Sequence, residues 1–317
     1  MNKKNVLITG AAGFIGFHLA RHLTSRGDSV HGYDNFNSYY APKLKRDREK
    51  LLKAENVNIF DADICDALSL NKFIEKNEIT HIAHLAAQAG VRYSIDQPHE
   101  YIKANITGFL NILEACRLFP HLKLTYASSS SVYGLNKKVP FSETDRTDNQ
   151  ASLYGVTKKT NELMAETYHH LYGIPATGLR FFTVYGPWGR PDMAYFSFTK
   201  AIMEGLPINL FNEGNMQRDF TYIDDIVAGI TSAIDLEAPL EIFNLGNHNP
   251  VPLLRFVEIL EDALQKKAKK IFKPMQLGDV PETFADIEYS QKKLGFYPRV
   301  SLEEGIPKFI MWYRKYV

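Results

Sequence analysis

Residues 5–16 read NVLITGAAGFIG, and this stretch decides the fold. An apolar run typical of a buried strand leads into a turn that contains Gly10, Gly13 and Gly16, and an amphipathic helix is predicted over 14–26. Glycines at this spacing permit a tight turn, close approach of the backbone to an anion, and close packing of the helix. The N-terminus of the helix then faces that anion. The stretch therefore predicts a strand–turn–helix unit with a phosphate site at its turn.

Outward from this unit, short β-branched runs alternate with amphipathic segments. Further strands are expected at 28–35, 57–64, 80–87, 123–129 and 176–186. Strands that alternate with helices argue for a parallel sheet covered on both faces. We therefore predict an α/β fold with a Rossmann-type, doubly wound parallel sheet.

The alternation changes after Gly186, where GPWGRPD begins and shorter, less regular elements follow. We expect a cofactor-binding domain at 1–186 and a smaller C-terminal substrate-binding lobe at 187–317. A helix at 220–230 and a strand at 241–247 are expected to return to the first sheet, so the segment 222–247 belongs with it. The charged stretch at 43–53 is interpreted as the solvated face of a helix.

Composition narrows the class of function. The 317 residues include 37 Lys and Arg against 36 Asp and Glu, so no overall field attracts nucleic acid or an anionic membrane. Cys65 and Cys116 lie outside any metal-ligand spacing, and we expect no metal site. Three glycines interrupt the apolar start, which disfavours a signal peptide, and no apolar stretch is long enough to span a membrane. A cytoplasmic protein is expected.

The end of the second expected strand indicates the cofactor. Asp34 lies about 20 residues beyond the glycine turn, where an acidic side chain bonds the adenosine ribose of a dinucleotide. A carboxylate there repels a 2′-phosphate, and no arginine directly follows it. We therefore predict NAD rather than NADP.

Tyr154 and Lys158 carry the expected chemistry. They lie four residues apart in a helix expected at 152–171, and so share one face. A tyrosine with a pKa near ~10 is a poor base at neutral pH. An ammonium one helical turn away and the positive nicotinamide would lower that pKa. Four adjacent serines, 128–131, end the strand that precedes this helix.

These motifs resemble the extended short-chain dehydrogenase/reductase family over essentially the whole chain. The shared marks are TGAAGFIG (9–16), a hydroxyl-rich stretch before VYG (132–134), and Tyr-x-x-x-Lys. The resemblance implies that Tyr154 takes a proton from a sugar hydroxyl while hydride passes to NAD. It also implies that Lys158 binds the nicotinamide ribose and that Ser129 shares the hydroxyl's hydrogen bond. Which serine of the run relays the proton stays open.

The strand ends and the resemblance together give the expected cofactor contacts. They are Gly10, Gly13, Phe14, Ile15, Gly16, Asp34, Asn35, Asn37, Asp63, Ile64, Leu85, Ala86, Ala87, Asn105, Ser128, Tyr154, Lys158 and Phe181.

The second lobe resembles the nucleotide-sugar site of the same family. Arg218 in QRDFTYIDD is expected on the diphosphate, Phe211 in INLF beside uracil, and Asp279 in GDVPETFAD on the uridine ribose. Many relatives have a second phosphate arginine where this chain has Gln276, so Arg92 or a lysine is left for that role. The expected substrate contacts are Arg92, Ser129, Ser130, Ser131, Tyr154, Thr183, Arg190, Asn209, Phe211, Arg218 and Asp279.

The serine run also bears on the reaction. It lacks the Asp-Glu pair typical of 4,6-dehydratases and the glutamate typical of decarboxylating xylose synthases. An epimerase needs no further acid or base, because the 4-keto sugar turns over and takes the hydride back on its other face. YGPWGRPDMA (185–194) and QAGVRYS (88–94) resemble the UDP-glucuronate 4-epimerase branch. That resemblance implies epimerisation at C4 of UDP-glucuronate to UDP-galacturonate.

Arg190 has two interpretations: it recognises a C6 carboxylate, or it braces its own loop through Asp192. The serines and Thr183 would hold that carboxylate near the plane of the 4-keto group and so suppress loss of CO₂. The alternatives left open are a UDP-glucose or UDP-N-acetylglucosamine 4-epimerase and a catalytically silent NAD-binding module. Helices expected at 98–118 and 152–171 suggest a homodimer, by resemblance to the family.

Overall fold

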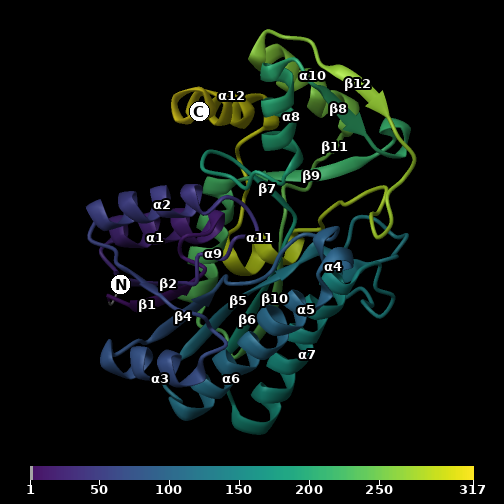
Figure 1. Ribbon diagram of the computed structural model, residues 1–317. Helices are drawn as coiled ribbons and strands as arrows, with labels where there is room; N and C mark the ends of the chain where they lie inside the picture. Colours follow the sequence, from purple (N-terminus) through teal and green to yellow (C-terminus); the bar gives the residue numbers. More distant parts are fainter. Residues whose placement is uncertain (1–2) are drawn as a thin grey trace.

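The computed structural model describes residues 3–317 and contains a seven-stranded sheet in which every neighbouring pair is parallel (Figure 1). The strand order is β3-β2-β1-β4-β5-β6-β10. The bounds are β1 (Asn5–Thr9), β2 (Ser29–Asp34), β3 (Ile59–Asp61), β4 (His81–His84), β5 (Lys123–Ser129), β6 (Ala176–Phe181) and β10 (Leu240–Leu245). The predicted doubly wound α/β fold is confirmed.

Helices cover both faces of the sheet, each over its own hydrophobic core (Figure 1). One face packs against α1 (Phe14–Arg26), α2 (Pro42–Ala54) and α9 (Ile223–Leu236). The other packs against α3 (Ala67–Lys76), α6 (Gly108–Leu118) and α7 (Leu153–Tyr172). A parallel sheet buried in this way exposes its strand ends, where ligands bind.

The helix expected at 98–118 is divided. It consists of α5 (Pro98–Tyr101), a π-helical turn over Ile102–Thr107, and then α6, with the short α4 (Tyr93–Asp96) ahead of it. Single π turns are rare and frequently occur at functional sites.

The strand expected at 176–186 is also divided, at Phe182. β6 stays in the main sheet, whereas β7 (Thr183–Tyr185) pairs with β9 (Gln217–Tyr222), which in turn pairs with β11 (Pro250–Pro252). The helix expected at 220–230 was therefore wrong at its start, because 220–222 form the end of a strand. The return of 241–247 to the main sheet is confirmed by β10.

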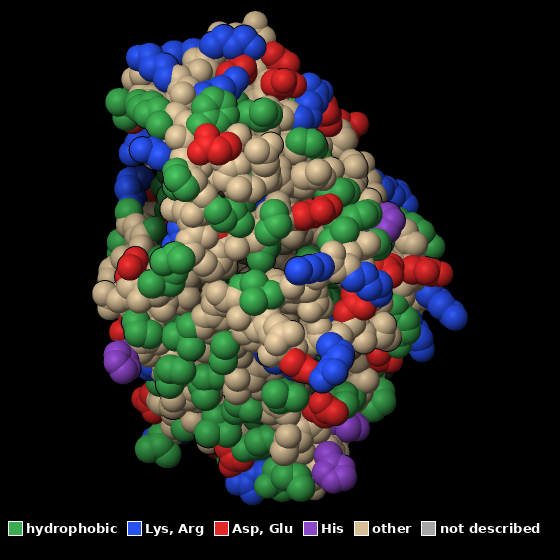
Figure 2. Space-filling view, turned by 90° about the vertical axis from the view of Figure 1, so that its right-hand side faces the viewer, with side chains coloured by type: hydrophobic (Ala, Val, Ile, Leu, Met, Phe, Trp, Pro, Cys, Tyr) green, Lys and Arg blue, Asp and Glu red, His purple; other side chains and the backbone are tan. Residues whose placement is uncertain are grey.

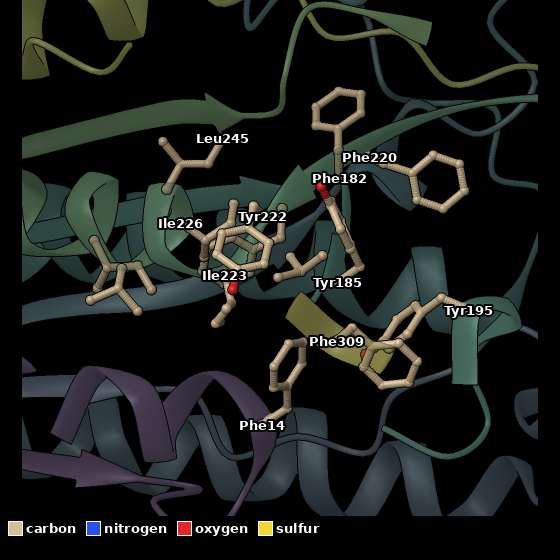
Figure 3. Packing of buried hydrophobic residues seen from close by; sticks show 14 of the residues in the cluster. Phe14, Phe182, Tyr185, Tyr195, Phe220, Tyr222, Ile223, Ile226, Leu245 and Phe309 are labelled. Atoms are coloured by element: carbon tan, nitrogen blue, oxygen red, sulfur yellow. The ribbon is translucent and has the colours of Figure 1, made fainter. Parts of the chain in front are cut away.

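The C-terminal half adds a second layer of elements above the sheet (Figure 1). It contains α8 (Ala194–Glu204), β8 (Pro207–Leu210), a 3₁₀ turn (Asn212–Gly214), α10 (Leu253–Leu264), β12 (Lys269–Phe272) and α12 (Leu302–Tyr316). Helix α11 (Glu288–Leu294) instead packs against α9 and β10 of the main sheet. The core of the second layer is continuous with the core under α1 and α9. Figure 3 shows this junction, where Tyr195 faces Phe309 and Tyr185 lies near Tyr222.

Helix α2 corrects the interpretation of 43–53 as a solvated face. Leu44, Lys45, Arg48 and Leu52 are all buried, and Arg48 has no exposed surface. Leu44, Arg48 and Leu52 recur every four residues, so the arginine lies in the middle of the buried face.

Positive and negative side chains are interspersed on the face drawn in Figure 2, and hydrophobic side chains gather on its lower half. Within residues 3–317, no helix combines the length and the apolar character that crossing a membrane requires.

Candidate active site

One large cavity lies at the carboxyl ends of the strands, between the sheet and the C-terminal half. Its volume is about 800 Å³, near the upper end of the usual range for small-molecule sites. Every expected cofactor and substrate residue lines it except Asn105. Segments far apart in the sequence therefore meet at one place.

The glycine turn forms the floor of the cavity. Gly10 has a φ of 72°, and a Cβ there would come within 2.8 Å of the Ala86 backbone nitrogen. A Cβ at Gly16 would collide with the carbonyl of Gly10. The first strand, the turn and the loop after β4 therefore approach one another more closely than any other residue type would allow.

Asp34 ends β2 beside this turn. One carboxylate oxygen accepts from the Ala12 amide at 3.0 Å and the other accepts from the Phe36 amide at 2.8 Å. Burial raises the pKa of Asp34, while the charge of Lys45 and these amides oppose the rise. The carboxylate is thus fixed in orientation, and each oxygen retains a lone pair for a further donor.

Two cations from α2 lie near this end of the cavity. Lys45 Nζ donates to the backbone oxygen of Asn37 at 2.9 Å and to its side-chain oxygen at 2.7 Å. Arg46 is paired with Asp61 at 2.6 Å and stacks over Phe36. Both cations already have protein partners.

Tyr154 and Lys158 project from the first turns of α7. The helix begins at Ser152, whose hydroxyl accepts from the Gly155 amide at 3.1 Å. Lys158 is buried and donates to the Ala127 carbonyl at 2.8 Å. Burial lowers the pKa of Lys158 to about 8. A Tyr-x-x-x-Lys pair thus lies against the end of β5, as the spacing predicted.

Burial raises the pKa of Tyr154, and two neighbours oppose the rise. These are a hydrogen bond with Ser129 and the positive charge of Arg190. The charge of Arg190 thus lowers the pKa of the Tyr154 phenol. The sequence analysis expected this effect from Lys158. The link between Ser129 and Tyr154 brings together two of the residues expected to share the sugar hydroxyl.

The four serines divide into different environments. Ser128 is buried and donates to Glu162 at 2.7 Å, so its hydroxyl is engaged inside the protein. Ser129 accepts from the Ser131 amide at 3.2 Å and starts a 3₁₀ turn over Ser130–Tyr133. Ser129, Ser130 and Ser131 all face the cavity, and so does Thr183.

Arg190 and Asp192 form an ion pair at the cavity wall. The Nε and Nη2 atoms of Arg190 donate to the two oxygens of Asp192 at 3.1 and 2.6 Å. The hydroxyl of Tyr39 donates to the same carboxylate at 3.0 Å. Nη1 of Arg190 makes no hydrogen bond to any residue in the described chain. The pair therefore braces the loop, as one interpretation had it, and leaves one donor face of the guanidinium for a ligand.

The expected uridine contacts also cluster. Arg218 donates to Asp279 at 2.7 Å, and the guanidinium of Arg92 lies 5.0 Å from the ring centroid of Phe211. Burial lowers the pKa of Arg218, and the nearby charge of Arg92 adds to that effect. The two guanidinium groups thus line the same cavity. Asn209 lines the same region.

Asn105 was expected among the cofactor contacts, but its side chain lies behind the cavity wall. Its side chain is buried, accepts from the Gln88 amide at 2.8 Å, and donates to the Gln88 carbonyl and to Thr157 at 3.0 Å each. Its own carbonyl, in the π turn, accepts from Asn161 at 2.6 Å. Asn105 therefore supports the loop after β4 from behind the cavity wall.

The sequence analysis missed several residues that line the cavity, among them Tyr39, Lys45 and Asp192. Tyr39 lies in a loop without a motif. Lys45 was assigned to a solvated face. Leu44 and Leu52, two turns apart on one face of α2, were the signal that could have identified that helix as packed against the rest of the domain.

The glycine turn, the acidic end of β2 and the tyrosine and lysine on α7 define a Rossmann-type, dinucleotide-binding enzyme. A family model described as the NAD dependent epimerase/dehydratase family matches residues 6–246. The chain belongs to this family.

Named relatives are similar over nearly the full chain. UDP-glucuronate 4-epimerase 4 of Arabidopsis thaliana is 52% identical over 333 residues, which cover 99% of this chain and 76% of the relative. The crystal structure of UDP-glucuronic acid 4-epimerase from Bacillus cereus, in complex with UDP-glucuronic acid and NAD, has a TM-score of 0.92 at 34% identity, with coverage of 99% and 100%.

A UDP-glucose 4-epimerase from Thermotoga maritima with UDP-glucose has a TM-score of 0.88 at 31% identity, with coverage of 98% and 99%. Proteins named for an acidic sugar and for a neutral sugar thus share this fold. Choice between such sugars must depend on individual side chains.

Proposed function

We propose that this protein is an NAD-dependent UDP-glucuronate 4-epimerase, which interconverts UDP-glucuronate and UDP-galacturonate through a 4-keto sugar. The proposal rests on which side chains line the cavity around Tyr154. Small hydroxyl side chains and the unengaged face of Arg190 border the same cavity, and no carboxylate interrupts the serine run. The relatives named for this activity, about half identical over the full chain, support the same conclusion.

The residues present fit NAD. The open glycine turn at the start of α1 offers backbone amides to a diphosphate, and Asp34 offers lone pairs to the adenosine ribose. Lys45 and Arg46 are engaged with protein oxygens, which leaves no free cation there to favour a 2′-phosphate. When bound, NAD accepts a hydride from the sugar and returns it.

Tyr154 accepts the proton of the C4 hydroxyl, and Ser129 shares the hydrogen bond. The charge of Arg190 stabilises the phenolate. Lys158, which is held by the Ala127 carbonyl, presents its remaining N–H groups to the nicotinamide ribose. After the keto sugar turns over, Tyr154 returns the proton to the oxygen at C4.

Oxidation of glucuronate at C4 gives a β-keto acid, which loses CO₂ most readily when the carboxylate bond stands perpendicular to the carbonyl plane. Ser130, Ser131 and Thr183 donate hydrogen bonds that hold the carboxylate near that plane. Nη1 of Arg190 adds a charged donor. Neutral hydroxyls bind a carboxylate without supplying an acid that would promote a different reaction.

The second candidate is a 4-epimerase of UDP-glucose or UDP-N-acetylglucosamine, which the similarity to the Thermotoga protein favours. The test offers UDP-glucuronate and each neutral UDP-sugar in parallel, without added NAD, and follows the products by chromatography. We expect UDP-galacturonate from the first. Faster turnover of a neutral sugar would replace the proposal with the second candidate.

Tyr154→Phe tests the chemistry separately from binding. We expect turnover to be abolished while NAD stays bound, because the ring remains and only the base is removed. Tyr172→Phe, the same change at an exposed position at the end of α7, is the matched control and should keep turnover. Turnover that survives in Tyr154→Phe would show that another base acts.

We also propose the division into a cofactor domain at 1–186, to which 222–247 return, and a substrate lobe. A homodimer and a cytoplasmic location belong to the same proposal. Exposed apolar side chains on α6 and α7 support the dimer. Cys65 and Cys116 are unpaired thiols, which fits a reducing compartment.

A further inference from the structure

The guanidinium of Arg48, on α2, is completely buried and bonds two separate parts of the active site. Nη1 donates to the Ala12 carbonyl, in the glycine turn, at 2.8 Å and to the Tyr40 hydroxyl at 2.9 Å. Nη2 donates to the carbonyls of Trp188 at 2.6 Å and Gly189 at 3.2 Å. One terminal nitrogen thus binds the cofactor turn, and the other binds the loop of residues 187–193.

Burying the charge of Arg48 in this way costs solvation free energy. No ion pair within residues 3–317 includes Arg48, and its hydrogen bonds all go to neutral oxygens. The buried carboxylate of Asp34 is near enough for the charge of Arg48 to lower its pKa, but the two groups form no ion pair. Burying a charge without a directly bonded carboxylate costs solvation free energy, and a methionine would fill similar space at less cost. A planar guanidinium, however, is the side chain that can hold carbonyls from two segments at fixed angles.

The loop of residues 187–193 is held by side chains on both sides of Arg48's contacts. The ring of His18 bonds the Pro187 carbonyl at 2.9 Å, and the Arg190 amide donates to the Tyr195 hydroxyl at 3.2 Å. Three consecutive carbonyls and the next amide are therefore bound by side chains. The residue that follows these contacts is Arg190, whose charge acts on Tyr154.

We propose that Arg48 is a positioning residue, which fixes the 187–193 loop to the cofactor turn and thereby places Arg190 beside Tyr154. The catalytic part of this inference rests on the proposed function. The distance between the cofactor turn and the 187–193 loop is then fixed. Arg190 therefore contacts the sugar at a fixed distance from the nicotinamide site.

The first test needs no substrate. In Arg48→Lys the charge is kept, but a single nitrogen cannot reach both the Ala12 carbonyl and the carbonyls of Trp188 and Gly189. Amide hydrogen exchange across 187–193 should become about tenfold faster than in the wild type. Arg46→Lys, the same change on the exposed side of α2, should leave that exchange unchanged. Unchanged exchange in Arg48→Lys would overturn the proposal, whatever reaction the enzyme performs.

The second test is a double-mutant cycle with Arg190→Met, with bound NAD measured in each variant. Arg48→Lys should lower kcat/KM for UDP-glucuronate about tenfold in the wild-type background and less than twofold in the Arg190→Met background. Equal losses in both backgrounds would mean that Arg48 does not act through Arg190, and would also overturn the proposal. A wild type that does not convert UDP-glucuronate would remove the proposed function, while the exchange result would still decide the role of Arg48.

Discussion

At the scale of single residues, neighbours decide what identical side chains do. Ser128 and Ser129 are adjacent in one strand, yet the first donates to buried Glu162, whereas the second lies beside Tyr154 and lowers the pKa of its phenol. Strand alternation sends successive side chains to opposite faces, which accounts for the difference. A run of four serines is therefore not one site: all four line the cavity, but the hydroxyl of Ser128 is engaged with Glu162.

The proposed carboxylate contacts give a prediction about product ratio. Ser130→Ala and Thr183→Ala together should raise the ratio of CO₂ to epimer by about tenfold or more, because a hydrogen bond to a charged group contributes about 1.5–3 kcal/mol. Released CO₂ and UDP-galacturonate are measured in the same reaction. Exposed Thr144→Ala is the control and should leave the ratio unchanged. An unchanged ratio in the double variant would remove the carboxylate role and leave the oxidation scheme intact.

Lys158 gives a prediction about stability and pH. Its folded pKa of about 8 lies below the ordinary 10.5, so burial of its charge costs about 3 kcal/mol at pH 7. Lys158→Met removes that cost and loses one hydrogen bond worth about 1 kcal/mol. The variant should thus be inactive, yet about 2 kcal/mol more stable by urea unfolding.

The sign of the pH dependence is a check on this assignment. Between pH 8 and 10.5 the unfolded lysine holds its proton while the folded one has lost it, so wild-type stability rises with pH in that window. The advantage of Lys158→Met should shrink by pH 10. An advantage that stays constant with pH would mean that the lysine's charge is not the cause.

At the scale of elements, α7 is held on the sheet by a buried ion pair. Glu162 on α7 meets Arg180 on β6 at 2.8 Å, and Ser128 on β5 donates to the same carboxylate. Arg180 in turn donates to the Tyr133 hydroxyl at 3.0 Å. These bonds fix the helix that carries Tyr154 against the strands that carry the serines.

Arg180→Met should destabilise the fold by about 3 kcal/mol, because it leaves buried Glu162 with only Ser128 and the more distant Lys159, at 3.5 Å, as partners. Burial raises the pKa of Glu162, but the bonds and charge of Arg180 outweigh it and hold that pKa below its ordinary value. The pair thus stabilises above pH 4.5, and this is lost as pH falls through the folded pKa. Urea unfolding at pH 7 and pH 4 measures both effects. In the Glu162→Gln background the arginine substitution should cost less; equal costs would contradict the account.

Elements with local signals were predictable, and elements set by tertiary contacts were not. Helix α1 has a glycine turn before it and Gly27 after it, and its predicted bounds of 14–26 match the structure. The division of 176–186 has no such signal. Phe182 continues the apolar pattern, and only pairing of 183–185 with β9 places the break there.

At the scale of the whole molecule, the site lies where two parts of the chain share a core. Tyr316, at the end of α12, donates to Asp47 on α2 at 2.8 Å, and Trp188 packs between Phe17 of α1 and Trp312 of α12. Nearly every residue that the sequence motifs singled out lines the cavity, because each lies at a strand end or in a family signature. The motifs could not predict the supporting role of Asn105 or the burial of Arg48, since both side chains bond backbone atoms of residues distant in the sequence.

The outer surface of the NAD-binding half gives the last prediction, which concerns assembly. Val156 and Leu163 lie seven residues apart on one face of α7, and both are exposed, as is Leu110 on α6. A twofold axis would place these apolar side chains against their own copies. In sedimentation experiments we expect twice the 36.1 kDa chain mass. Leu163→Glu should yield monomers, because it buries a carboxylate against its symmetry mate, whereas Leu206→Glu, on the other half, should not. A wild-type monomer, or a Leu163→Glu dimer, would exclude this interface.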